Sequence, residues 1–177
     1  MVDFLWDNLF KKNKQEEIAI KRLKKTHLFS QLTRKELVLL SKHLHIRQYR
    51  PKEPVFRQGE MGVGLYVVIQ GHVNIHSRND LELETKETLI TRLGPGDFFG
   101  ELALVEENGR RTASASACDE ALLAGFFQPD LHEMIDRYPN LAVKILLRLS
   151  EILGTRLKET TTTVSALKRE LKVIDTH

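Results

Sequence analysis

The N-terminal part of the chain carries apolar residues at helical spacing. Thr33 and Glu36 have the pattern of a capping box, and Leu37, Leu40 and Leu44 then share one helical face. Upstream, apolar positions with the same period predict one or two short amphipathic helices before residue 29. These positions are Phe4, Leu5, Leu9, Phe10, Ile18, Ile20 and Leu23. We therefore expect the chain to begin with helices.

From residue 46 the pattern changes to short apolar or alternating runs. Glycines at positions 59, 62, 64, 71, 94 and 96 separate these runs. The runs predicted as strands are 55–56, 65–69, 73–76, 81–85, 89–93, 112–117 and 121–127. Closely spaced strands of this kind indicate an antiparallel roll or barrel.

Helical spacing returns at 131–137 and continues from residue 141, after Pro139, to near the C terminus. In this last stretch residues alternate at steps of four and three, which is the heptad pattern of a coiled coil. The seam consists of Leu146, Ser150, Leu153, Leu157, Thr160, Val164, Leu167, Leu171 and Ile174. It predicts a parallel homodimer. The alternative is a helix whose first half, to about Leu153, packs only on its own roll.

These patterns together predict a mixed fold, a β-roll plus α-helices. We expect an antiparallel double-stranded β-helix, jelly-roll-like, flanked by N-terminal helices and by a long C-terminal helix. The predicted divisions are an N-terminal amphipathic segment at 1–28, the roll with its flanking helices at 29–140, and a C-terminal lid or dimerisation helix at 141–177.

Composition indicates the size class and the cellular compartment of the protein but does not indicate a function. Its 177 residues suit one domain with an attached helix or two. The 27 Lys and Arg residues against 24 Asp and Glu give a mild positive charge, which alone does not indicate nucleic acid. A lone Cys118 cannot form an internal disulfide, and no apolar run approaches the ~20 residues that span a bilayer. We therefore expect a cytoplasmic protein.

The stretch 94–117, GPGDFFGELALVEENGRRTASASA, pairs a carboxylate with an arginine around a glycine-led helical turn. Gly100 permits a close approach of the backbone, and the first amides of the turn suit an anion. Arg111 can meet two phosphodiester oxygens with its planar fork, and Thr112 adds a hydroxyl. Glu101 would repel a phosphate unless it accepts a hydrogen bond from a sugar hydroxyl. The stretch therefore predicts a pocket for a cyclic phosphate on a ribose.

The order FGELAL, six intervening residues, then RTA resembles the phosphate-binding cassette of the cyclic nucleotide-binding domain family. The resemblance implies that Glu101 takes the ribose 2′-hydroxyl and that Arg111 and Thr112 hold the phosphate. Because Arg110 adjoins Arg111, either arginine is a candidate. We choose Arg111, since Thr112 and Ala113 then occupy the positions of the family's small residues. The amides expected to face the ligand are those around Gly100, Leu102 and Ala103.

The same resemblance implies that a helix closes over the base. Alignment of 145–150 with the cyclic AMP receptor branch of the family places Thr160 and Thr161 where hydroxyls from two subunits meet adenine. Arg156 falls where an arginine braces the ribose-binding carboxylate. The candidates for the opposite wall are Val73, Ile75, Ile90 and Leu93, and strand alternation leaves open which of them point inward.

Other functions compete with this interpretation. Histidines at 43, 45, 72 and 76 suggest a cupin-like metalloprotein, but their spacing does not suit a metal site and no nucleophile and base pair stands out. We therefore expect no metal and no enzyme. Relatives of the cyclic AMP receptor type carry a helix-turn-helix after the dimer helix, and because this chain ends at His177 we expect no DNA-binding domain.

A third alternative is an interaction scaffold that retains the fold without binding a ligand. Its N-terminal segment, residues 1–25, would bind a partner protein or an anionic membrane surface, or would fold back on the roll. Our prediction is a non-enzymatic sensor that binds cyclic AMP and acts on an unknown effector by ligand-driven helix rearrangement. Cyclic GMP is the alternative ligand, since the family position of Thr112 also allows a bond to guanine, and a cyclic dinucleotide is a further one.

Overall fold

Eight strands form two four-stranded sheets in the computed structural model, which describes residues 17–78, 87–106 and 108–174. One sheet has the order β1 (His45–Tyr49), β8 (Ala121–Phe127), β3 (Gly64–Gln70) and β6 (Phe98–Phe99). The other has the order β2 (Pro54–Phe56), β7 (Ser114–Ala117), β4 (Val73–Arg78) and β5 (Glu87–Leu93). All the pairings are antiparallel, so the predicted antiparallel roll is confirmed. The predicted strand at 81–85 lies outside the described residues.

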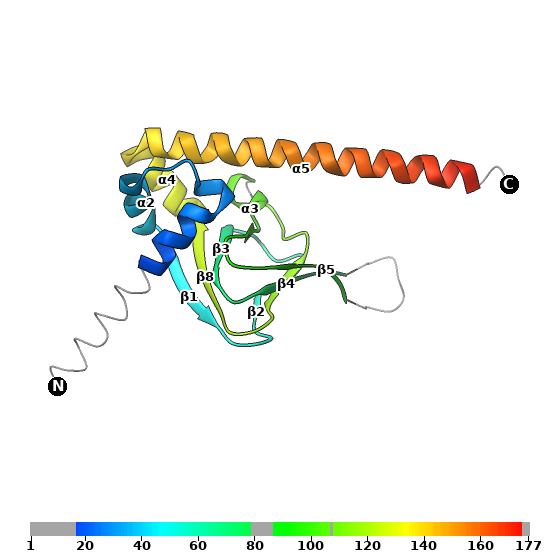
Figure 1. Ribbon diagram of the computed structural model, residues 1–177, viewed down its shortest axis with the longest axis horizontal. Helices are drawn as coiled ribbons and strands as arrows, with labels where there is room; N and C mark the ends of the chain where they lie inside the picture. The colour runs from blue at the N-terminus through cyan, green and yellow to red at the C-terminus, as the bar shows by residue number, and fades with distance from the viewer. Residues whose placement is uncertain (1–16, 79–86, 107, 175–177) are drawn as a thin grey trace.

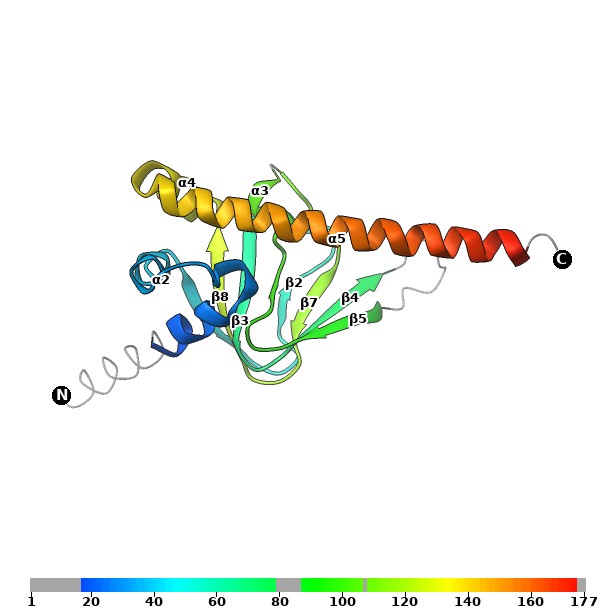
Figure 2. The ribbon, with the colours of Figure 1, turned by 45° about the horizontal axis from the view of Figure 1, so that its top comes forward.

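Helices flank this roll at both ends of the chain. Residues 17–25 are helical, and they are followed by η1 (His27–Phe29), α2 (Arg34–Ser41), α3 (Leu102–Val105), α4 (Gln128–Arg137) and α5 (Pro139–Ile174). Helix α5 passes over the roll and then extends beyond it (Figures 1 and 2). It starts at Pro139 rather than at residue 141, because proline fits the first turn of a helix. Within the described residues, no helix is long and apolar enough to cross a membrane.

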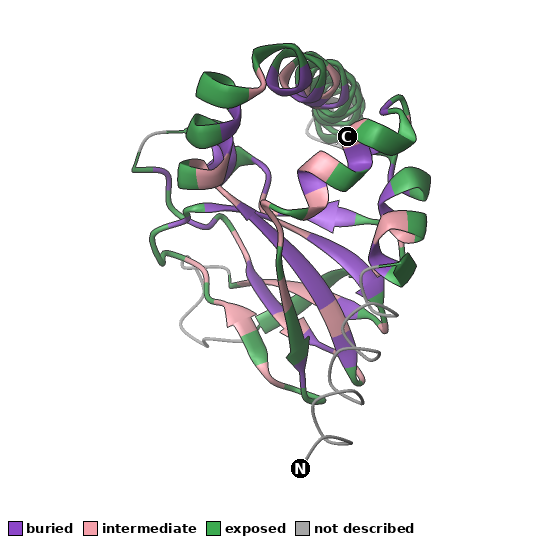
Figure 3. Ribbon diagram, turned by 90° about the vertical axis from the view of Figure 1, so that its left-hand side faces the viewer, coloured by how far each residue is buried: buried purple, intermediate pink, exposed green. Residues whose placement is uncertain are grey.

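The larger core lies between the first sheet and the helices. Phe126 of β8, Met134 of α4 and Ile145 of α5 are fully buried in it. Buried residues gather on the inner strands and on the helix faces that cover them (Figure 3). Ala19 and Leu23 belong to the same cluster, so residues 17–25 pack on the roll. Residues 1–16, with the predicted Phe4 to Phe10 stripe, lie outside the described residues.

The two halves of helix α5 differ in burial. Its first half buries Leu149 and Ile152, with Leu146 and Leu153 partly buried beside them. Beyond residue 153 every described side chain is exposed. The exposed heptad positions include Leu157, Val164, Leu167 and Leu171. The homodimer stays a prediction, because the structure describes a single chain.

The predicted capping box of α2 is present and is extended by a lysine from α5. The Thr33 amide donates to the Glu36 carboxylate at 2.7 Å, and the Glu36 amide donates to the Thr33 hydroxyl at 3.3 Å. Lys144 Nζ donates to the other carboxylate oxygen at 2.6 Å. The bond from Lys144, and then the bond from the Thr33 amide, lower the pKa of Glu36 from 4.5 to about 2.

The charge of Glu36 should stabilise the fold in a defined pH range. Because its pKa is lower in the folded state, the contribution is complete above the usual value of 4.5 and is lost as the pH falls toward about 2. We expect Glu36→Gln to lower the free energy of unfolding by about 1 kcal/mol at pH 7. Urea denaturation of both proteins between pH 2 and 7 measures the difference. A difference that does not shrink at low pH would contradict the role of the charge.

Candidate ligand-binding site

A cavity of about 280 Å³ opens beside α3, between the second sheet and α5. Ten of the predicted site residues line it: Ile75, Leu93, Gly100, Glu101, Leu102, Ala103, Arg111, Thr112, Ala113 and Arg156. The remaining lining residues are Phe56, Thr91, Phe98, Phe99 and Arg110. The fold thus brings the two parts of the cassette together with a side chain from α5.

Ile90 does not line the cavity and is 58% exposed. A bulge in the β4–β5 pairing sets Ile75 opposite Thr91 and His76 opposite Leu89, so Ile90 has no partner in register. Alternation along β5 therefore turns Thr91 and Leu93 inward and Ile90 outward. We correct the prediction accordingly: Thr91 takes the place of Ile90 in the cavity wall.

Thr160 and Thr161 also lie outside the cavity lining, on the exposed half of α5. The Thr160 hydroxyl donates to the Arg156 carbonyl and the Thr161 hydroxyl to the Leu157 carbonyl, both at 2.8 Å. Thr160 is one helical turn beyond Arg156, on the same face. Contact of these threonines with a base stays a prediction.

Two lining residues, Phe56 and Thr91, were missed by the prediction from sequence. Phe56 comes from β2, far from the cassette in the chain, and only the β2–β7 pairing brings it near Arg111. Thr91 follows from strict alternation back from Leu93, but the extra residue Ile90 in β5 breaks the alternation along the rest of that strand, and the sequence does not reveal the bulge.

Arg111 is a buried cation, 6% exposed. Its Nη1 donates to the Gly100 carbonyl at 3.0 Å, while its buried Nε has no hydrogen-bond partner in the described part of the chain. Burial lowers the pKa of the Arg111 guanidinium, and Tyr66 and Glu101 partly offset this effect. The neighbouring Arg110 is exposed and donates to the Gly59 carbonyl at 2.7 Å. Of the two arginines, Arg111 is therefore the buried one and the one with an unpaired N–H group among the described residues.

Two glycines make room for the Arg111 guanidinium. Gly100 has a φ of 73°, a left-handed conformation, and a Cβ there would collide with Arg111 Nη1. A Cβ on Gly62 would collide with Ala103 and would lie 3.1 Å from Arg111 Nε. The backbone can therefore approach the guanidinium only where it carries no side chain.

Glu101 is 9% exposed and accepts a hydrogen bond from Arg156 Nη1. The Arg156 guanidinium also lies over the Phe98 ring, with Cζ 5.0 Å from its centroid. The carboxylate on the cavity wall is therefore tied directly to α5.

The amides of the α3 turn are only partly free. The Ala103 amide, which we predicted to face a ligand, donates to the Gly100 carbonyl at 3.3 Å, and the Leu104 amide donates to the Glu101 carbonyl at 3.0 Å. The preceding amides, at Gly100 and Leu102, begin the turn and have no intrahelical acceptor. They are the better candidates for contact with an anion.

The histidines form pairwise contacts. His45 Nε2 lies 3.0 Å from Asp130, His72 Nδ1 lies 2.8 Å from Asp119, and His43 Nδ1 donates to the Leu39 carbonyl at 3.1 Å. Among the described residues, no three His, Cys, Asp or Glu side chains gather in a way that could hold a metal ion. The geometry thus gives the cupin-like alternative no support.

The model of the cyclic nucleotide-binding domain matches residues 46–138, more than half of the chain. The chain belongs to the cyclic nucleotide-binding domain family. It is similar to the Cyclic AMP receptor protein of Thermus thermophilus, with 35% identity over 133 residues, 73% of this chain and 60% of the relative. It is 33% identical over 125 residues to the cAMP-activated global transcriptional regulator CRP of Haemophilus influenzae, covering 71% of this chain and 53% of the relative.

The solved structures agree with this assignment. The Thermus thermophilus Catabolite Activator Protein superimposes with a TM-score of 0.71 at 31% sequence identity, over 81% of this chain and 63% of that chain. The predicted resemblance to the family and the predicted fold class are both confirmed. The names of the two curated relatives describe a receptor and a regulator, and neither describes an enzyme.

The expectation that DNA is excluded as a partner is wrong. This chain spans only 60% and 53% of the two curated relatives, and the second is named a transcriptional regulator. We drew the exclusion from the end of the chain at His177, and that position does not decide whether DNA is a partner.

The conformation of Gly100 generates a test with a matched control. Gly100→Ala adds a Cβ where φ is positive and Arg111 is adjacent, so we expect a loss of about 1–3 kcal/mol in the free energy of unfolding. A Cβ on Gly154, within α5, would meet nothing within 4 Å. Gly154→Ala should therefore stabilise the protein by about 0.5–1 kcal/mol. Urea denaturation measures both, and changes of the same sign would contradict this account.

Proposed function

We propose that this chain is a non-enzymatic sensor that binds cyclic AMP in the cavity beside α3. The observation that carries the proposal is Arg111, a buried guanidinium whose Nε has no partner among the described residues. A buried charge is costly unless an opposite charge compensates it. A cyclic phosphodiester supplies one negative charge and two exocyclic oxygens that match the guanidinium fork. Membership of the cyclic nucleotide-binding domain family supports the same ligand class.

The other lining residues take complementary roles in this proposal. Glu101 accepts a hydrogen bond from the ribose 2′-hydroxyl, and the amides of Gly100 and Leu102 face the phosphate together with Thr112. Ala113 leaves space beside them. Ile75, Leu93 and Thr91 supply a mostly apolar wall for the purine, as is usual for small-molecule sites.

The hydroxyls of Thr160 and Thr161 favour adenine over guanine. Each hydroxyl proton is directed at a backbone carbonyl of the preceding turn, which leaves the oxygen lone pairs free to accept. The 6-position of adenine carries a donating amino group, whereas that of guanine carries an accepting carbonyl. The name of the Thermus thermophilus relative points to the same nucleotide.

Helix α5 is the proposed output element. The Arg156–Glu101 pair connects it to the carboxylate that would bind the ribose, so a ligand that competes for Glu101 also acts on the position of α5. In this scheme the division 1–28 is the N-terminal amphipathic segment, 29–140 is the nucleotide-binding roll with its flanking helices, and 141–177 is the lid or dimerisation helix. The effector is not identified, and the name of the Haemophilus influenzae relative makes transcription the first process to test. A cytoplasmic location, expected from the lone cysteine, is part of the proposal.

The assignment of Arg111 is tested by alanine substitution. Arg111→Ala should weaken cyclic AMP binding at least tenfold, because removal of one partner of a buried charge pair costs about 2–5 kcal/mol. Arg110→Ala is the comparison, because Arg110 also lines the cavity; it is exposed and donates to the Gly59 carbonyl, so its removal should weaken binding clearly less than removal of Arg111. Isothermal titration calorimetry measures both.

Three outcomes would overturn parts of this proposal. Equal losses for the two arginines would remove the special role of Arg111. Wild-type binding of cyclic GMP or cyclic di-GMP in preference to cyclic AMP would replace the ligand. Wild-type protein that binds none of these nucleotides would leave the scaffold alternative.

The role of the two threonines is tested by valine, which keeps the shape and removes the hydroxyl. Thr160→Val and Thr161→Val should each reduce the preference for cyclic AMP over cyclic GMP by about threefold to tenfold, the value of one hydrogen bond. Thr162→Val and Thr163→Val are controls on the same helix, since their hydroxyls make the same backbone bonds at 2.9 and 3.1 Å. Competition titrations give the ratio. An unchanged ratio in the first pair would show that these threonines do not contact the base.

A further inference from the structure

The charge of Arg111 is not neutralised by direct contact with a carboxylate. The ion pairs among the described residues do not include it, although Glu101 and Glu60 are close enough to influence its pKa. A guanidinium that is buried in this way would normally turn toward the nearest carboxylate. Some other contact must therefore hold it in the cavity wall.

That contact is the face of an aromatic ring. Arg111 Cζ lies 4.0 Å from the centroid of the Phe56 ring and 5.8 Å from that of Tyr66. Phe56 in turn packs against Tyr66 at 6.0 Å and against Phe99 at 5.8 Å, and Tyr66 and Phe99 are stacked at 5.6 Å.

The backbone of Arg111 is fixed by the loop that follows Phe56. The Gly59 amide donates to the Arg111 carbonyl, and the Arg111 amide donates to the Glu60 carbonyl, both at 2.8 Å. Because these bonds hold the main chain, the direction of the side chain is set by what contacts the guanidinium. The bond from Nη1 to the Gly100 carbonyl fixes one edge, and the Phe56 ring fixes the plane.

A ring face and a carboxylate have different consequences for an incoming anion. A carboxylate would occupy the N–H edge of the guanidinium and would compete with a phosphate for it. An aromatic face attracts the cation through its quadrupole and contacts only the flat side of the guanidinium, so it leaves free the N–H groups that do not donate to the Gly100 carbonyl. The charge is stabilised and remains available to a ligand.

We propose that Phe56 is a positioning residue. Its ring holds the Arg111 guanidinium in an orientation that leaves N–H groups available to the phosphate of the ligand. This inference rests on the proposed function, because the anion it serves is the cyclic phosphate. Without the ring, Arg111 is free to turn toward Glu60 or Glu101, and a ligand must then break that ion pair before it can bind.

The first measurement is calorimetric titration of cyclic AMP into single variants. Phe56→Leu removes the ring face and should weaken binding about tenfold, whereas Phe56→Tyr keeps the face and should stay within about twofold of wild type. Phe127→Leu is the matched control, since Phe127 packs edge-on against Tyr66 at 5.7 Å but does not line the cavity. If Phe56→Leu does not fold, Phe56→Met provides a larger flexible side chain without a ring.

The second measurement separates an effect through Arg111 from an effect on the ligand or the fold. In an Arg111→Gln background residue 111 has no charge for the Phe56 ring to attract. Phe56→Leu should therefore reduce the affinity for cyclic AMP by less than about twofold in that background. An equal loss in both backgrounds would show that Phe56 acts directly on the ligand or only on packing, and would overturn the proposal. Rescue by Phe56→Tyr together with loss of the effect in the Arg111→Gln background supports it.

The two proposals fail in different ways. If wild type binds cyclic AMP and Phe56→Leu binds it equally well, the positioning role is wrong and the proposed function stands. If wild type binds no cyclic nucleotide, the proposed function is wrong and the positioning role falls with it.

Discussion

A buried guanidinium without a counter-ion is the constraint around which this structure is organised. Arg111 is held by one carbonyl, one ring face and two backbone bonds. The carbonyl is that of Gly100, and the other three contacts come from Phe56 and the loop that follows it. Gly100 and Gly62 carry no Cβ because a side chain at either position would occupy its space. The charge of the Arg111 guanidinium is therefore only partly compensated within the protein. A cavity wall of this kind suits an anion without rearrangement when the anion binds.

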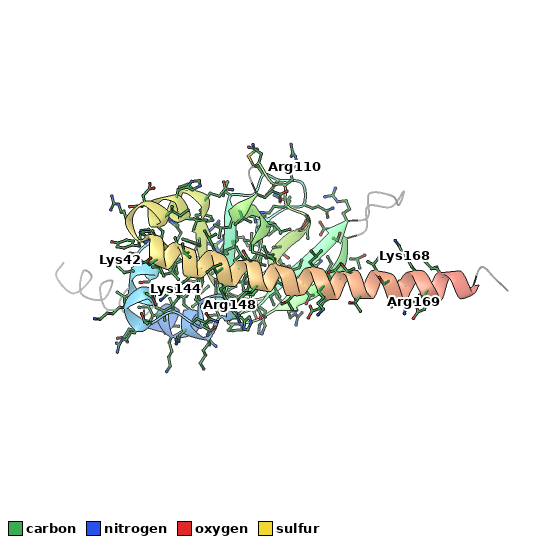
Figure 4. All side chains as sticks on the ribbon, turned by 90° about the horizontal axis from the view of Figure 1, so that it is seen from above. Lys42, Arg110, Lys144, Arg148, Lys168 and Arg169 are labelled. Atoms are coloured by element: carbon green, nitrogen blue, oxygen red, sulfur yellow. The ribbon has the colours of Figure 1, made fainter. Side chains whose placement is uncertain are left out.

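The same cavity is connected to the helix that leaves the roll. Arg156 of α5 contacts Glu101 on the cavity wall, while the first half of α5 is anchored elsewhere by Lys144 to Glu36 and by Arg148 to the His27 carbonyl. Figure 4 shows Lys144 and Arg148 on the part of α5 that covers the roll, and Lys168 and Arg169 on the part that projects beyond it. One half of α5 is therefore fixed to the roll, and the described side chains of the other half are exposed.

Much of the site was predictable because the family's cassette is local. Gly100, Glu101 and Arg111 lie within twelve consecutive residues, and the chemistry of a glycine-led turn with one acid and one arginine limits the ligands that can bind there. The opposite wall was harder to predict, since strands contribute single side chains and a bulge shifts their alternation. The sequence prediction therefore included Ile90 and neither Thr91 nor Phe56.

The sequence by itself determined the order of helices and strands, the antiparallel roll and the cassette, because periodicity, turn residues and a contiguous motif are properties of neighbouring positions. Only the tertiary structure decided that Arg111 rests on Phe56, that Arg156 reaches Glu101, and that Thr91 rather than Ile90 faces the cavity. These contacts join residues far apart in the chain. They depend on strand register and on the path of α5, which are set when the sheets and helices bury their apolar faces together.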